Sequence, residues 1–127
     1  MNRNIFALLT AMGLQAGCAS SDGSLLTPKD FQAAYQNDPD SYLLDVRTPS
    51  EYVSGHIEGA ELLDFNSGTA FQKGISALDK DKTYYIYCHS GNRSGQAARY
   101  MKSQGLNVVE LQGGIMAWSI AGMPLVQ

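Results

Sequence analysis

From residue 25 onward, the chain alternates between short apolar runs and segments in which apolar residues recur at helical spacing. The apolar runs predict buried strands at 42–46, 60–63, 83–87 and 108–111. The run TYYIY at 83–87 is the most strand-like, because every residue in it is β-branched or aromatic. Strands separated by helices are typical of an α/β domain, in which a parallel sheet is covered on both faces.

Local start and stop signals predict where the helices lie. The sequence TPKD at 27–30 combines an N-cap threonine, a proline in the first turn and an early acidic residue. The sequence TPSE at 48–51 is a full capping box, and its short helix is expected to end at Gly55. Further helices are expected within 65–78, with Phe71, Ile75 and Leu78 buried, over 94–104, with Ala97, Ala98 and Met101 buried, and from 113 through Trp118.

Residues 1–19 have the layout of a secretory signal. A positively charged start precedes an apolar run at 5–14, and small residues follow it. Ten apolar residues are too few for a permanent membrane span, which needs roughly 20. The sequence therefore predicts an exported protein whose single domain covers residues 25–127, located in the periplasm or at the cell envelope.

The end of this segment leaves two processing outcomes open. The sequence LQAGC, which ends at Cys18, is similar to a bacterial lipobox, in which the cysteine is acylated. Gln15 departs from the aliphatic residue usual at its position, and ordinary cleavage after Ala19 is the alternative. The domain is expected to touch a membrane only through a lipid anchor, if Cys18 carries one.

Composition excludes several classes of protein. The 127 residues suffice for one domain with one modest core. There are 9 Lys and Arg against 12 Asp and Glu, a net charge of −3, and no basic run, so nucleic acid is not an expected partner. Two cysteines are too few for an iron–sulfur ferredoxin or a disulfide scaffold. With Cys18 lipidated or removed, Cys88 is the lone thiol of the folded domain.

The chemistry is predicted to lie in the segment from Tyr87 to Gly95, where a buried strand ends in Cys88 and a polar, glycine-containing loop leads into a helix. Ligands of open α/β sheets bind beyond the carboxyl ends of the strands. The amides of a tight loop form an anion-binding nest, and the next helix adds the positive end of its dipole. We expect these groups to favour the thiolate of Cys88, which is the nucleophilic form.

The loop residues suggest individual roles. Gly91 permits the positive φ that a nest commonly needs, and Arg93 supplies a planar cation suited to oxyanions. Ser94 is expected either to cap the helix with its hydroxyl or to donate toward the sulfur. For Ser90 and Asn92, the backbone amides are expected to matter more than the side chains.

Two alternatives stay open at this point. His89 is as consistent with a solvent-facing loop position as with a catalytic role. Cys88 is either a nucleophile or an inert core thiol, the commonest state of free cysteine. The five polar or flexible residues after it favour the first interpretation, because they make burial hard to sustain.

The spacing between Cys88 and Arg93 favours a particular ligand. Four residues separate the two, whereas protein tyrosine phosphatases place five there to build a wider cradle for tetrahedral phosphate. If the loop closes in the same manner, its tighter ring of amides suits a persulfide, whose extra atom is a single sulfur. A phosphatase-like or arsenate-reductase-like thiolate enzyme is the competing hypothesis, disfavoured by this spacing and by the lack of an evident general acid.

Three stretches, taken together, resemble the small single-domain form of the rhodanese family over roughly residues 25–127. They are DVRTPSEY at 45–52 leading into GHIEGA at 55–60, the loop CHSGNRSGQAA at 88–98, and GGI at 113–115 followed by Ala117 and Trp118. The sequence departs from many relatives at His89, where arginine is frequent. The resemblance implies a five-stranded parallel sheet flanked by helices on both faces.

The resemblance also implies a function, with Cys88 as a carrier of sulfane sulfur. An anionic donor such as thiosulfate would load Cys88, and cyanide, a thiol or a protein acceptor would unload it, with no metal or organic cofactor. Arg47 is a candidate to hold the donor, although an ion pair with Asp or Glu is the default expectation. His56 is expected to be structural and Trp118 to lie in the core. A non-catalytic or relay sulfur carrier at the cell envelope is the alternative.

Overall fold

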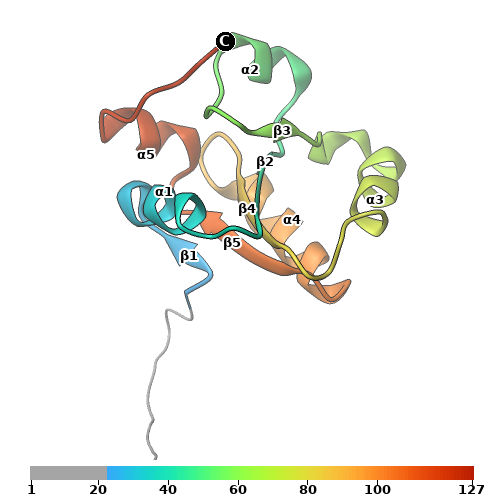
Figure 1. Cartoon of the computed structure of the whole chain (residues 1–127). Coiled ribbons are helices and arrows are strands. Elements are labelled where there is room, and N and C mark those ends of the chain that lie inside the picture. The colour runs from blue at the N-terminus through green and yellow to red at the C-terminus, as the bar shows by residue number, and fades with distance from the viewer. Residues whose placement is uncertain (1–22) are drawn as a thin grey trace, which may run out of the picture.

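The computed structural model describes residues 23–127, so the predicted signal segment 1–19, Cys18 included, lies outside the described residues. The described chain forms one five-stranded sheet in the order β1-β5-β4-β2-β3, and every pair of neighbouring strands is parallel (Figure 1). The elements, in chain order, are β1 (Leu25–Leu26), α1 (Pro28–Gln36), β2 (Ser41–Asp45), α2 (Pro49–Ser54), β3 (Glu61–Leu62), η2 (Phe65–Ser67), α3 (Thr69–Ser76), β4 (Thr83–Tyr87), α4 (Asn92–Ser103), β5 (Asn107–Leu111) and α5 (Gly114–Ile120).

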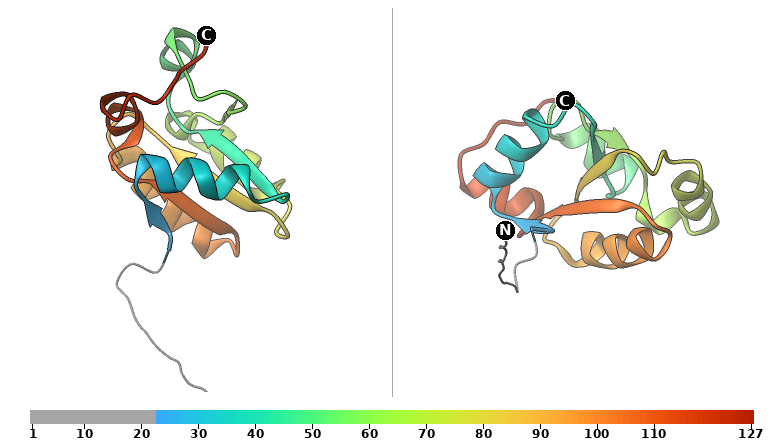
Figure 2. Two further views of the ribbon diagram at one scale, coloured as in Figure 1. Left: turned by 60° about the vertical axis from the view of Figure 1, so that its left-hand side comes forward. Right: turned by 60° about the horizontal axis from the view of Figure 1, so that its bottom comes forward.

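Helices cover both faces of the sheet. The right-hand view of Figure 2 shows α1 and α4 on opposite sides of β5. One core cluster contains the buried side chains of α3 and α4, and a second contains those of α1 and α5. The α/β fold predicted from the alternating pattern, and the five-stranded parallel sheet implied by the resemblance, are thereby confirmed.

Strand β4 is buried on both faces, which explains why its apolar run is continuous rather than alternating. Tyr84 and Ile86 belong to the core cluster on the α3 and α4 side, whereas Tyr85 and Tyr87 belong to the cluster on the α1 and α5 side. Successive side chains of a strand point to opposite faces, and here both faces are buried. Because β4 pairs with both β2 and β5, it lies at the centre of the sheet, and Cys88 leaves the sheet at its middle.

The structure corrects several predicted boundaries. Strand β1 was not predicted, because two residues at a sheet edge leave almost no pattern. Helix α3 ends at Ser76, so Leu78 follows the helix and is only half-buried. Helix α4 begins two residues earlier than expected, at Asn92, directly after Gly91. That shift shortens the loop after β4 and brings the helix N-terminus against Cys88.

The end of the chain packs back onto the turn after α2. His56 and Val126 exchange two backbone hydrogen bonds of 2.8 Å, and the indole of Trp118 donates to the Pro124 carbonyl at 2.8 Å. Figure 1 shows the C-terminus beside α2. Trp118 is buried, and His56 stacks on Tyr52 with 3.8 Å between ring centroids, so the expected core and structural positions are confirmed.

Within residues 23–127, none of the helices has the length and apolar character that a bilayer crossing requires.

Candidate active site

The thiol of Cys88 lies where β4 ends and the loop toward α4 begins. Gly91 adopts the left-handed conformation, with φ of 110°, and its N–H donates to the Cys88 Sγ at 3.0 Å. The predicted glycine geometry and the helix N-terminus at the loop are therefore both present. The first N–H groups of a helix have no partner within that helix. Because α4 begins directly after Gly91, such N–H groups lie at the end of the loop. Of the loop amides described, that of Gly91 alone bonds Sγ, so the predicted ring is only partly formed around it.

Cys88 is only 1% exposed, which contradicts the expectation that a polar loop would keep it open. The loop satisfies its polar groups without exposing the sulfur, because His89 and Ser90 are exposed to solvent. The carbonyls of Cys88 and His89 accept hydrogen bonds from the backbone N–H groups of Ile115 at 2.9 Å and Met116 at 3.0 Å. The first turn of α5 therefore binds the loop backbone, and a donor must reach the sulfur with a narrow end.

This contact accounts for the GGI motif at 113–115. A Cβ atom on Gly114 would lie 2.5 Å from the carbonyl oxygen of His89 and 2.7 Å from that of Cys88. Gly114 also has a φ of +63°, a conformation that is unfavourable for residues with a Cβ atom. Glycine at this position lets α5 approach closely enough to bind the two carbonyls.

Ser94 lies behind the thiol and is fully buried. Its Oγ is 3.5 Å from Cys88 Sγ, 3.3 Å from the Gly91 carbonyl oxygen and 2.7 Å from Glu110 Oε2. The predicted helix cap is wrong, since α4 begins at Asn92 and the Ser94 side chain caps no amide. Ser94 does contact the sulfur, but the direction is opposite to the one predicted: the Cys88 thiol donates to Ser94 Oγ, and the Ser94 hydroxyl donates to Glu110. Glu110 was not predicted, because only the packing of α4 against β5 brings it here.

Arg93 makes a bidentate ion pair that the sequence did not predict. Its two terminal nitrogens donate to the two carboxylate oxygens of Glu51 at 2.7 and 2.9 Å. Glu51 Oε1 also accepts from the N–H and hydroxyl of Thr48 in the capping box, at 3.1 and 3.0 Å. The hydrogen bonds from Arg93 lower the pKa of Glu51 to about 2, and those from Thr48 contribute. The guanidinium of Arg93, which was expected to bind an incoming oxyanion, is thus already bound to the carboxylate of Glu51.

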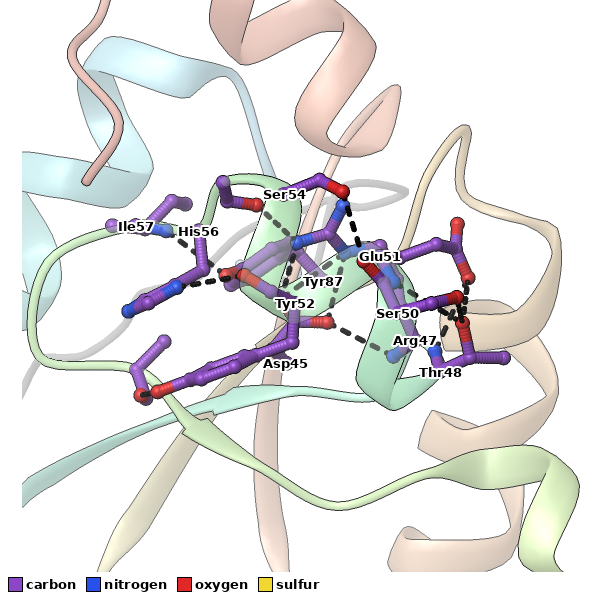
Figure 3. A network of polar contacts seen from close by, with 12 residues as sticks. Asp45, Arg47, Thr48, Ser50, Glu51, Tyr52, Ser54, His56, Ile57 and Tyr87 are labelled. Atoms are coloured by element: carbon purple, nitrogen blue, oxygen red, sulfur yellow. Dashed lines mark hydrogen bonds and ion pairs between the residues drawn. The ribbon is translucent and has the colours of Figure 1, made fainter. Parts of the chain in front are cut away.

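Arg47 forms the expected ion pair, with Asp45 (Figure 3). Its Nε donates to the Asp45 carboxylate at 3.0 and 3.1 Å, and a terminal nitrogen binds Asp45 at 2.6 Å and the Gly55 carbonyl at 2.7 Å. Both side chains are buried, and the Arg47 guanidinium lies 5.7 Å from the centroid of the Tyr87 ring. Arg47 therefore ties the end of β2 to the turn after α2.

A cavity of about 620 Å³ opens beside the loop. Its apolar lining comes from Ile115, Met116, Ile120 and Leu125. Its polar side chains are those of Arg47, Ser50, Glu51, Ser54, His89 and Ser119. The Asn92 side chain is exposed and accepts a hydrogen bond from Gln96 at 2.9 Å, away from the sulfur. The structure thus brings Cys88, Gly91, Arg93, Ser94 and the cavity-lining His89 and Arg47 to one edge of the sheet. Among residues 23–127, no group of three or more His, Cys, Asp or Glu side chains is placed to hold a metal ion.

Comparison with known proteins identifies the family. The model of the rhodanese-like domain matches residues 27–121. The thiosulfate sulfurtransferase GlpE of Pseudomonas fluorescens is 36% identical over 99 residues, which cover 77% of this chain and 86% of that protein. A rhodanese-related protein of Thermoplasma volcanium, solved by crystallography, matches with a TM-score of 0.70 and 30% identity, over 80% of this chain and 95% of that one. The chain belongs to the rhodanese family.

Some relatives are much longer. The probable adenylyltransferase/sulfurtransferase MoeZ of Mycobacterium tuberculosis is 36% identical over 104 residues, which are 79% of this chain but 26% of that protein. The chain therefore corresponds to about a quarter of that relative.

The contact between α5 and the loop predicts the effect of substituting Gly114. Gly114→Ala is expected to lower the free energy of unfolding by about 1 kcal/mol more than Gly122→Ala, because a clash with backbone cannot be relieved by a rotamer change. Gly122 has a similar φ of +78° with nothing within 4 Å of its Cβ position, so it controls for backbone strain. Urea denaturation of both variants measures the difference, and equal losses would contradict the proposed close approach.

The buried hydroxyl of Ser94 predicts a second difference in stability. Ser94→Ala leaves the Glu110 carboxylate without its partner and is expected to cost about 1 kcal/mol of unfolding free energy. Ser103→Ala removes an exposed hydroxyl of the same helix and is the matched control, expected to change stability little. Thermal or urea unfolding compares the two, and a neutral Ser94→Ala would show that the Ser94–Glu110 bond contributes nothing.

The lowered pKa of Glu51 predicts a pH dependence of stability. Its ion pair stabilises the fold fully above the usual pKa of 4.5, and this contribution is lost as the pH falls from there through about 2. The unfolding free energy of the wild type should therefore fall more steeply over this range than that of Glu51→Gln. Glu58→Gln, at an exposed position, controls for the loss of one carboxylate. Parallel slopes for wild type and Glu51→Gln in pH-dependent urea unfolding would show that the ion pair adds no stability.

Proposed function

We propose that this protein is a sulfurtransferase that carries a sulfane sulfur on Cys88. The observation that carries the proposal is the placement of the one described cysteine, at the carboxyl end of the central strand β4, with the Gly91 N–H at 3.0 Å from Sγ. Membership of the rhodanese family supports it, as does the name of the Pseudomonas fluorescens relative, a thiosulfate sulfurtransferase.

The first step is a nucleophilic displacement on sulfur. The Cys88 thiolate attacks the outer sulfur of the donor, a sulfur–sulfur bond forms, and the donor's own sulfur–sulfur bond breaks. With thiosulfate, sulfite leaves with the electron pair of the broken bond, and Cys88 becomes a persulfide. Three negative charges stand on each side of this step, so no oxidant, metal or organic cofactor is needed.

The loop stabilises the negative charge that this step moves. A well-placed backbone donor contributes about 3 kcal/mol to such a transition state. The outer sulfur of the persulfide lies one bond beyond Sγ, within the loop closed by the N-terminus of α4. In the second step a thiol or cyanide attacks that outer sulfur and restores the Cys88 thiolate.

The proposal predicts that Cys88 gains sulfur on exposure to a donor. Mass spectrometry after incubation with excess thiosulfate, and in parallel with benzyl persulfide, should show one added sulfur atom on the wild type. Cyanide should then remove it as thiocyanate. Cys88→Ser is the control and should gain none, because a hydroxyl cannot hold the transferred sulfur.

Four outcomes would contradict the proposal. Failure of both donors to load the wild type would exclude sulfur transfer through Cys88, and loading of Cys88→Ser would place the carrier elsewhere. Hydrolysis of phosphate esters by the wild type but not by Cys88→Ser would instead favour a phosphatase-like enzyme. A loaded Cys88 that neither cyanide nor small thiols can discharge would favour the relay carrier.

A further inference from the structure

Resting on the proposed function, we infer that the site is built for an organic persulfide with an uncharged, apolar body, and that Glu51 sets this preference against thiosulfate. The inference combines two independent observations about the same cavity. Arg47 and Arg93 are already paired with carboxylates, and exposed apolar side chains line the cavity beside the loop.

The first observation concerns the charge of the loop. Both terminal nitrogens of Arg93 bind Glu51, and Glu51 is further fixed by Thr48, so the carboxylate is held in place from two sides. An arginine fork engaged by a carboxylate cannot bind an oxyanion in the same bidentate manner. A dianionic donor would have to displace Glu51 or lie beside its negative charge.

The second cation near the loop, Arg47, is compensated as well. Arg47 is the one Lys or Arg side chain that lines the cavity, and it is bonded to the fully buried Asp45. The four charges of these two pairs sum to zero. Thiosulfate therefore meets no uncompensated Lys or Arg among the cavity-lining residues, whereas a donor with an uncharged body depends less on such a cation.

The apolar wall supplies what a neutral donor needs. Five large apolar side chains are exposed in the described part of the chain, and three of them, Met116, Ile120 and Leu125, line this cavity. Ile120 is 83% exposed, so its side chain is open to a ligand in the cavity. The volume of about 620 Å³ lies within the usual range of small-molecule sites, so we assign the wall to the body of a small organic persulfide.

The reaction with such a donor balances without further reagents. The Cys88 thiolate attacks the outer sulfur of R–S–SH, the bond between the donor's two sulfurs breaks, and R–S⁻ leaves with its electron pair. The proton stays with the transferred sulfur, and one negative charge stands on each side. The leaving thiolate carries the apolar group R, which the wall of α5 would hold near the loop.

The test compares two donors on the wild type and on Glu51→Gln. The ratio of kcat/KM for thiosulfate to that for benzyl persulfide should lie below one in the wild type. Glu51→Gln should raise this ratio by about tenfold or more, because it frees Arg93 to bind the dianion. Gln at this position retains the capping box, so the variant is expected to fold.

Two further variants make the test specific. In the double variant with Arg93→Gln, the gain from Glu51→Gln should disappear, because the freed cation is then absent. Glu58→Gln removes one exposed carboxylate outside the cavity and should leave the ratio unchanged. A rise with Glu58→Gln equal to that with Glu51→Gln would attribute the effect to net charge and overturn the inference.

A matched pair of variants tests the apolar wall separately. Ile120→Ser should lower kcat/KM for benzyl persulfide at least about threefold more than for thiosulfate, whereas Val53→Ser, exposed but not lining the cavity, should lower neither selectively. An unchanged ratio in Glu51→Gln, or a wild type that favours thiosulfate, would overturn the inference while leaving sulfur transfer through Cys88 intact. Failure of both donors to load Cys88 would instead contradict the proposed function.

Discussion

The geometry of the candidate site depends on one backbone contact, the pair of hydrogen bonds from the first turn of α5 to the carbonyls of Cys88 and His89. The N–H groups of Ile115 and Met116 satisfy these carbonyls and fix the backbone of the loop at Cys88 and His89. The approach is close enough that a methyl group on Gly114 would collide with it. A thiol that is almost fully buried can thus sit in a polar loop without leaving the loop's carbonyls unpaired.

Glu51 joins three parts of the molecule. It closes the capping box that starts α2, pairs with Arg93 at the start of α4, and lines the cavity. Glu51 therefore has a local role in its own helix and also neutralises the charge of Arg93, which lies some forty positions away in the chain. Removing its charge while keeping its hydrogen-bonding shape separates these two roles, because the capping box accepts glutamine and the ion pair does not.

Local signals predicted much of the fold and the place of the chemistry. The capping box at Thr48, the strand that ends at Tyr87 and the positive φ of Gly91 are properties of neighbouring residues, and they were confirmed. The contacts of Arg93 with Glu51 and of Ser94 with Glu110 were missed, because these partners are 42 and 16 residues away in the chain and only tertiary packing brings them together. The burial of Cys88 was misjudged for the same reason, and the export signal stays a prediction.

The chain end that returns to the turn after α2 has a consequence for how the cavity is maintained. Leu125, one of its walls, is held by the bridge between His56 and Val126 and by the bond from Trp118 to Pro124, rather than by either core cluster. Trimming or displacing the last few residues would open the cavity on one side while the sheet and the thiol loop stayed intact. The shape of the cavity on that side therefore depends on two contacts made by the chain end, and not on the packing of the sheet.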